Sequence, residues 1–164
     1  LGAVYLGFGD VLVGGIKEKG FGDNNRLAVY LIALRSIVDA PLLGYGYGTF
    51  TDVFPMYRDR SISIVGVWEQ AHNTYLEVFQ GLGLVFGPML VVSVLLLVLS
   101  CIKGAITRQE NSTIPCVAAS AAFLVGTHAL VDSALQIQAI TLTFMAILGA
   151  GVAQSESSRK TLSD

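Results

Sequence analysis

The feature that most constrains this chain is a run of 21 residues, 82–102, without a single charged side chain. At about 1.5 Å per residue, a helix of that length extends about 31 Å, which is enough to cross a hydrocarbon core of about 30 Å. Two more uncharged runs follow at 111–131 and 133–155, and only Asp132 separates them. The sequence therefore predicts an all-α membrane fold, with three transmembrane helices at 82–102, 113–131 and 134–154.

The composition agrees with a membrane protein. Hydrophobic residues make up 53% of the chain and charged residues only 13%, whereas average soluble domains carry roughly 25% charged residues. The alternative, three buried helices of a soluble protein, fits poorly because Ser93 is the only polar residue in 89–99 and a surface helix needs a polar face. The formal net charge of −2 gives no indication of nucleic-acid binding.

Lysine and arginine residues near the ends of the uncharged runs predict the orientation in the membrane. Lys103 and Arg108 lie between the first two runs, and Arg159 and Lys160 follow the third, whereas the turn around Asp132 has neither residue type. By the positive-inside rule, the connector after the first run and the tail, 155–164, face the cytoplasm. The Asp132 turn and the polar segment before residue 82 then face the outside.

The three predicted transmembrane helices make up a membrane domain at 82–154. The chain before this domain is predicted to form two regions. Residues 1–16 are interpreted as the end of a preceding membrane helix and the start of a loop, because Asp10 interrupts an apolar, glycine-rich stretch. Residues 17–81 form the outward loop, with apolar helices of its own. We therefore expect the C-terminal portion of a larger polytopic protein.

A helix is expected within the outward loop. Its apolar body, 27–38, follows three candidate N-caps, Asp23, Asn24 and Asn25, and Pro41 ends it. Because almost every face is apolar, this helix should be buried or lie against the bilayer surface. Arg35 is expected to pair with Asp39 at i,i+4. Arg26 lies at the positive end of the helix dipole, where it either binds an anion or remains a solvated charge.

The stretch "GYGYGTF" that follows this helix alternates glycine with aromatic residues. A nucleotide-binding loop is disfavoured because such a fingerprint follows a strand, whereas here a helix and a proline come first. The glycines should allow sharp turns, while Tyr45, Tyr47 and Phe50 anchor the segment at the membrane interface. Residues 51–68 show no clear period and are expected to form a loop.

Ionisable residues gather around the stretch "AHNTYLEVFQGLGLVFG" at 71–87, just before and within the first uncharged run. If the helix starts at Asn73, then Asn73 and Glu77 share one face, and His72 stands at the helix N-terminus at the outer boundary of the membrane. Alone, such a histidine is more often a cap or a surface residue than a catalytic one. His128 and Asp132 form a second i,i+4 pair at the same boundary, where ionisable groups often mark function.

The two cysteines do not indicate a metal site. Cys101 and Cys116 lie in apolar surroundings near the cytoplasmic ends of their runs. They are too few for a metal centre and are expected to pack as small hydrophobic residues.

In their order along the chain, "DAPLLGYGYGTF", "AHNTYLEVFQGLGLVFG" and "HALVD" resemble the O-antigen ligase and O-antigen polymerase superfamily over roughly residues 20–155. The resemblance implies a multi-pass glycosyltransferase of the bacterial inner membrane with a large periplasmic loop. It also implies an undecaprenyl-diphosphate-linked glycan donor, an acceptor such as lipid A-core or another glycan, and no cofactor or metal. Polymerisation of repeat units and protein O-glycosylation remain open alternatives. More distant alternatives are a transporter segment, which should carry ionisable residues near the bilayer midplane, and a structural membrane subunit.

The resemblance also assigns roles to residues of the outward loop. His72 matches the loop histidine of the family and is the expected catalytic base, and Arg26 matches a loop arginine expected to bind the diphosphate. Asn73, Glu77, His128 and Asp132 are possible supporting residues. A further arginine of an earlier loop has no counterpart here, so this chain alone is expected to be inactive. Gln80 stands where the family often has an acidic residue.

Overall fold

The computed structural model describes residues 23–60, 62, 68–108 and 111–156, without the side chains of 23–25. The predictions for 1–22, for the tail at 157–164 and for the N-cap side chains of the first helix lie outside the described residues. Every regular element within them is helical, which confirms the all-α prediction. The elements are α2 (Asp23–Asp39), α3 (Phe50–Tyr57), α4 (Thr74–Thr107), α5 (Thr113–His128), η1 (Ala134–Gln136) and α6 (Gln138–Glu156).

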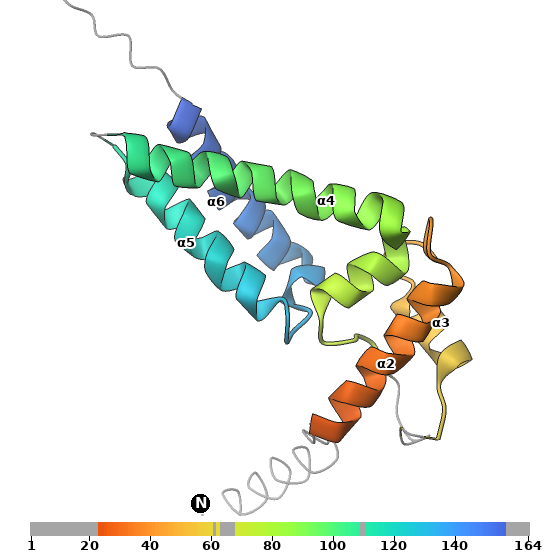
Figure 1. The fold of residues 1–164 in the computed structure, drawn as a ribbon. Coiled ribbons are helices and arrows are strands. Elements are labelled where there is room, and N and C mark those ends of the chain that lie inside the picture. Colours follow the sequence, from red (N-terminus) through yellow and green to blue (C-terminus); the bar gives the residue numbers. More distant parts are fainter. Residues whose placement is uncertain (1–22, 61, 63–67, 109–110, 157–164) are drawn as a thin grey trace, which may run out of the picture.

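Three long helices form an antiparallel bundle, and the remaining elements gather at one end of it (Figure 1). α4, α5 and α6 pack against one another, whereas the main contacts of α2 and α3 are with α4, beside its first part, and with each other (Figure 1). α2 ends at Asp39, as the proline at 41 predicted. One end of the bundle therefore carries both α2 and α3.

Two of the helices, α4 and α6, are long and apolar enough to cross a membrane by length and composition. α5, with 16 residues, is apolar but shorter than that, and it ends at His128 rather than at residue 131. α6 begins at Gln138 rather than at residue 134, because Ala134–Gln136 form a separate 3₁₀ turn. The exposed side chains along these helices are largely leucine, valine and isoleucine, a surface suited to lipid.

The first long helix, α4, is broken at Gly83, where φ is 66° and ψ is −172°. In an unbroken helix, Leu84 N–H would donate to the Gln80 carbonyl and Val85 N–H to the Gly81 carbonyl. The backbone of residues 41–46 supplies a partner to each of these four groups. Tyr45 N donates to Gln80 O over 3.0 Å and Gly46 N to Gly81 O over 2.9 Å, while Leu84 N donates to Pro41 O over 2.7 Å and Val85 N to Leu42 O over 3.3 Å. We call residues 74–82 the arm of α4.

Glycine is required at this junction for two reasons. Gly44 and Gly83 both have positive φ, at 68° and 66°, where a side chain strains the backbone. A Cβ on Gly83 would collide with the Leu42 carbonyl, and one on Gly44 would lie 2.5 Å from the Gln80 carbonyl oxygen. The expectation that these glycines allow sharp turns is confirmed. The packing of this segment against a break in α4 was not predicted.

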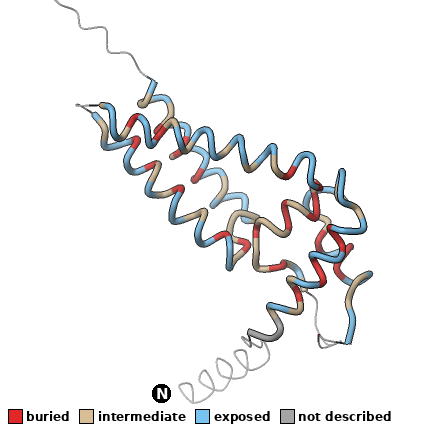
Figure 2. The backbone as a smooth tube through the Cα atoms, in the orientation of Figure 1, coloured by how far each residue is buried: buried red, intermediate tan, exposed pale blue. Residues whose placement is uncertain are grey.

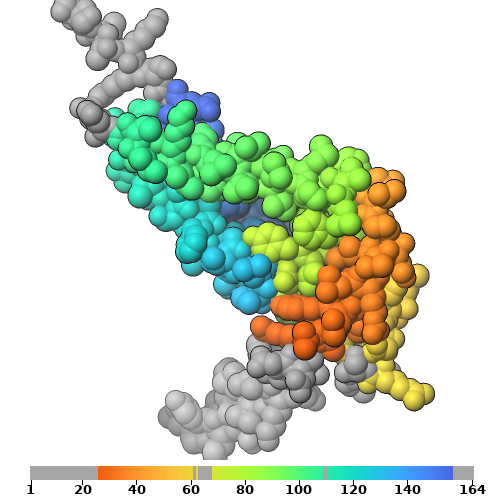
Figure 3. All heavy atoms as spheres, in the orientation of Figure 1, coloured from red at the N-terminus to blue at the C-terminus, as the bar shows by residue number. Residues whose placement is uncertain are grey.

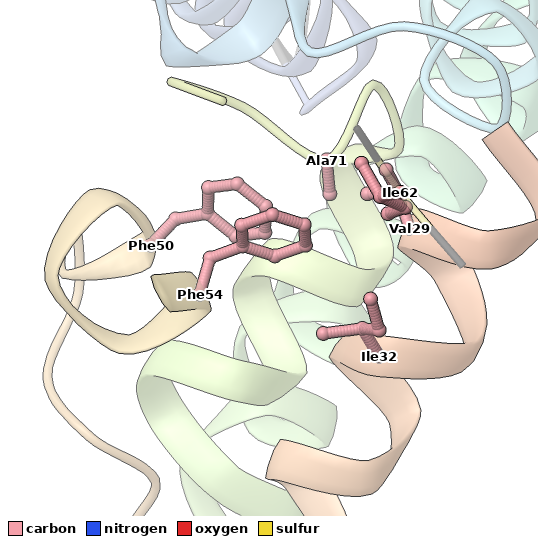
Figure 4. Close-up of a cluster of buried hydrophobic side chains, with 6 residues drawn as sticks. All are labelled: Val29, Ile32, Phe50, Phe54, Ile62 and Ala71. Atoms are coloured by element: carbon pink, nitrogen blue, oxygen red, sulfur yellow. The ribbon is translucent and has the colours of Figure 1, made fainter. Parts of the chain in front are cut away.

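A small apolar core holds α2 and α3 against the approach to the arm (Figure 4). Its buried residues are Val29, Ile32, Phe50, Phe54, Ile62 and Ala71. The prediction of a loop at 51–68 is therefore wrong in its first part, because 50–57 form a helix that buries two stacked phenylalanines. The prediction that Phe50 anchors the membrane interface is wrong as well, since this ring is 6% exposed within the core.

The expected ion pair between Arg35 and Asp39 is also wrong. Arg35 Nη1 instead lies 2.8 Å from Asp59 Oδ2, because the chain after α3 passes beside α2. The two side chains are 63% and 41% exposed, so this pair contributes little to stability.

At the far end of the bundle, small residues allow close contact between helices. A Cβ on Gly151 would lie 2.8 Å from Cys101 Sγ, and Gly104 similarly faces Ser155. Cys101 is fully buried, as expected, whereas Cys116 is exposed, which contradicts the expectation for that residue. Elsewhere, burial concentrates where the arm meets α2 and α3, and the long helices are mostly exposed along their length (Figure 2).

We predict that Gly83→Ala destabilises the protein strongly, because alanine disfavours the backbone conformation and its methyl group meets the backbone of 41–46. The expected loss is about 2–5 kcal/mol, seen as a lower thermal unfolding midpoint in detergent. Gly149→Ala is the control: a Cβ there has no neighbour within 4 Å, and in a helix this change should be neutral or stabilising by up to about 1 kcal/mol. Equal midpoints for both variants would contradict the proposed role of the junction.

Candidate functional site

Two connections meet at the end of the bundle that carries α2 and α3. The N-terminus of the arm docks on the turn between α5 and η1 through three hydrogen bonds. Thr74 N donates to Ala129 O over 2.9 Å, Asn73 Nδ2 to Leu130 O over 2.9 Å, and Thr74 Oγ1 to Asp132 O over 3.0 Å. Residues almost 60 positions apart are thus held side by side.

Two of the predicted site residues, His72 and His128, face the carboxylate of a third, Asp132. His72 Nδ1 lies 3.8 Å from Asp132 Oδ1, and His128 Nδ1 lies 3.7 Å from Asp132 Oδ2. All three side chains are between 41% and 54% exposed, so they are open to solvent. These separations are ion-pair distances, longer than a hydrogen bond, and a carboxylate on the Nδ1 side of an imidazole leaves Nε2 free to face solvent.

The backbone of His72 is fixed in an unusual conformation. Its φ of 55° lies in the left-handed region, which is uncommon for a residue other than glycine. The Tyr30 hydroxyl of α2 donates to the His72 carbonyl over 3.0 Å, and the Trp68 ring contacts the imidazole in an edge arrangement at 6.5 Å between centroids. Contacts from two other segments therefore set where this imidazole lies.

Arg26 lies near the start of α2. It precedes Tyr30 by one helical turn, so the two side chains lie on the same face of the helix, about 5–6 Å apart at Cβ. Because the Tyr30 hydroxyl reaches His72, this face of α2 is the one turned towards the histidine. The arginine side chain is partly exposed.

Asn73 and Glu77 have structural contacts that the helical spacing alone could not show. Asn73 caps α4, since its side-chain oxygen accepts a hydrogen bond from Leu76 N over 3.1 Å. The Glu77 carboxyl in the arm is 8% exposed and accepts hydrogen bonds from Ala71 N over 2.7 Å and Ser133 Oγ over 2.5 Å.

An apolar groove of about 620 Å³ runs along the bundle and ends beside this cluster. Figure 3 shows the surface hollowed between α4 and α5. The groove is lined mainly by aliphatic and aromatic side chains, among them Val94, Val98, Ala122 and Phe144, and its end is formed by Thr74, Tyr75 and Ala129.

Tyr30, Thr74 and Ser133 contribute to this cluster and were not predicted from the sequence. Only Tyr30 had a usable signal, its i,i+4 spacing from Arg26. Within the part of the chain that the structure describes, no group of three or more histidine, cysteine or acidic side chains could hold a metal ion.

Comparison with known proteins gives one match. The model of a family described as O-antigen ligase matches residues 1–92, which is more than half of the 164 residues. No curated protein and no solved structure matches the chain. The match includes Arg26, the junction at Gly83 and the sequence from His72 to Glu77, whereas His128, Asp132 and Ser133 lie beyond it.

Proposed function

The chain belongs to the O-antigen ligase family, and from that premise we propose that it moves a glycan from an undecaprenyl-diphosphate donor to an acceptor hydroxyl. Its family and its apolar helices indicate a membrane protein with glycosyltransferase-type activity in polysaccharide assembly. The donor, the acceptor and the reacting residues are the proposal. The observation that carries it is His72, held at the end of the bundle with its Nδ1 facing the Asp132 carboxylate.

In the proposed reaction, His72 Nε2 accepts the proton of the acceptor hydroxyl. The oxygen lone pair of that hydroxyl then forms a bond to the anomeric carbon of the glycan. The bond between that carbon and the diphosphate oxygen breaks, and its electron pair leaves with the polyprenyl diphosphate. Asp132 keeps the imidazole oriented and stabilises its charged form, in the manner of the carboxylate of a catalytic triad. His128 Nδ1 lies beside the other oxygen of Asp132, and it helps to hold the same carboxylate in place.

Arg26 is proposed to bind the donor diphosphate. Its planar guanidinium engages phosphate oxygens through two parallel hydrogen bonds and stays charged at any physiological pH. Its position at the start of α2 adds the positive end of the helix dipole. Binding at this point would stabilise the negative charge that grows on the leaving group.

The apolar groove supports a lipid-anchored substrate. A cavity of 150 Å³ can take one benzene ring, so the groove of about 620 Å³ has room for roughly four groups of that size. It ends on Thr74 and Ala129, beside the catalytic cluster. The groove can therefore hold a few isoprene units of the donor, a part of its undecaprenyl chain. Lipid A-core ligation, repeat-unit polymerisation and protein O-glycosylation would differ only in the acceptor.

The function is tested by His72→Ala in the intact protein, assayed with purified donor and acceptor lipids. General-base catalysis contributes about 10²–10⁴-fold, so turnover should fall by that factor while donor binding survives. Asn73→Ala should cost less, because an amide cannot take the proton. If His72→Ala abolished donor binding as severely as turnover, the histidine would belong to the diphosphate site and the proposed base would be wrong.

Arg26→Lys should impair transfer although it keeps the positive charge. An ammonium group cannot reproduce the two parallel hydrogen bonds of a guanidinium, so the affinity for the donor should fall towards that of Arg26→Ala. Donor binding measured for the two variants and the native protein separates the possibilities. Normal affinity in Arg26→Lys, with loss only in Arg26→Ala, would show that a diffuse charge is sufficient.

We further propose that the cluster faces the periplasm across the bacterial inner membrane, as the lysine and arginine distribution predicts. In a background with Cys101→Ala and Cys116→Ala, a cysteine replacing the exposed Asp52 of α3 should react with an impermeant maleimide in spheroplasts. A cysteine replacing the exposed Lys103 at the other end of α4 should react only after permeabilisation. The reverse pattern would overturn both the orientation and the periplasmic site.

A further inference from the structure

We propose that Glu77 is the positioning residue that aligns His72 with Asp132, an inference that rests on the proposed function of that pair. A single carboxylate oxygen, Glu77 Oε1, accepts both the Ala71 N–H over 2.7 Å and the Ser133 hydroxyl over 2.5 Å. Ala71 directly precedes His72, and Ser133 directly follows Asp132. One atom thus joins the two chain segments at the residues adjacent to the pair.

The contacts close a ring around the pair. Ser133 binds Glu77 with its hydroxyl and, with its backbone N–H, donates to Asp132 Oδ1 over 2.8 Å. The same Asp132 oxygen lies 3.8 Å from His72 Nδ1, and His72 is linked through Ala71 back to Glu77. The place of the imidazole relative to the carboxylate therefore depends on every bond of this ring, and Glu77 is its central acceptor.

The burial of these groups indicates why the carboxyl is needed. Ala71 and Ser133 are each 1% exposed and Glu77 is 8% exposed, so water cannot replace a lost partner. Burying a carboxyl is unfavourable unless hydrogen bonds compensate, and an apolar side chain would fill the same space without that cost. An apolar residue would, however, leave the Ala71 N–H and the Ser133 hydroxyl without their acceptor.

Glu77 acts through its neighbours rather than on the substrate. Its Oε1 already accepts two hydrogen bonds, and its side chain is enclosed by the arm and the turn after α5. The left-handed backbone of His72, with φ at 55°, needs a surrounding structure that holds it in place. The hydrogen bond that Ala71 N–H donates to Glu77 supplies one such constraint just before His72, and the hydrogen bond from Tyr30 to the His72 carbonyl supplies another.

Two substitutions of Glu77 in the intact protein separate geometry from charge. Glu77→Gln retains a carbonyl oxygen that can accept both hydrogen bonds, so kcat should stay within about threefold of the native value. Glu77→Leu has no acceptor. A misplacement of about 1 Å can cost about 100-fold in rate, so its kcat should fall by that order while the KM for the donor hardly changes. Ser133→Ala removes one of the two bonds and should lose a smaller part of kcat.

Hydrogen exchange provides a readout that needs no catalysis. In Glu77→Leu, the amide of Ala71 and the turn 129–133 should lose protection, whereas Glu77→Gln should keep both. Glu69→Leu is the matched control, because it removes an exposed carboxyl two residues before Ala71 and should change neither protection nor kcat. These measurements remain informative even if the native protein shows no transfer, in which case the proposed function fails separately.

Three results would overturn the positioning role. A normal kcat in Glu77→Leu would show that the ring does not align the pair. A loss in Glu77→Gln as large as that in Glu77→Leu would show that the negative charge matters rather than the hydrogen-bond geometry. A kcat loss in Glu77→Leu with unchanged protection at Ala71 would place the effect elsewhere in the protein.

Discussion

Backbone hydrogen bonding at the break in α4 is the constraint on which the rest of the structure depends. A helix in an apolar environment cannot leave carbonyl and amide groups without partners, since each costs several kcal/mol in hydrocarbon. At Gly83 the chain breaks its helix and meets this requirement with the backbone of residues 41–46. The break turns the arm away from the bundle axis (Figure 1). That junction determines the direction of the arm. It thereby determines where α2 packs beside the arm and where His72 lies.

The elements that could be predicted are those whose signals are local. The uncharged run after residue 82 lies within the long helix α4, Pro41 marked the end of α2, and the helix expected to start at Asn73 begins one residue later, at Thr74. The apolar run after Asp132 also produced a helix, although the 3₁₀ turn delayed its start. In each case residues within a few positions of one another determine the outcome.

The features that could not be predicted depend on partners distant in sequence. A glycine inside an apolar helix is ordinary, and only the approach of residues 41–46 gives Gly83 its left-handed conformation. Arg35 had an acidic residue at i,i+4, but the passage of the chain beside α2 gave it Asp59. The histidines could be singled out from the sequence because they are rare and ionisable. Ser133 and Tyr30 could not, because a hydroxyl becomes informative only when the group it bonds is known.

The junction at Gly83 also separates what must be kept in this chain from what can change. All four hydrogen bonds across it are made by backbone atoms, so they constrain the glycines and the path of the chain but no side chain of the contributing segment. Leu42 and Leu43 within that segment are each 66% exposed and lie where the arm leaves the bundle. Their identities can drift without loosening the break. A protein built in this way can acquire a new surface beside the arm, while the side chains gathered around Asp132 stay where they are.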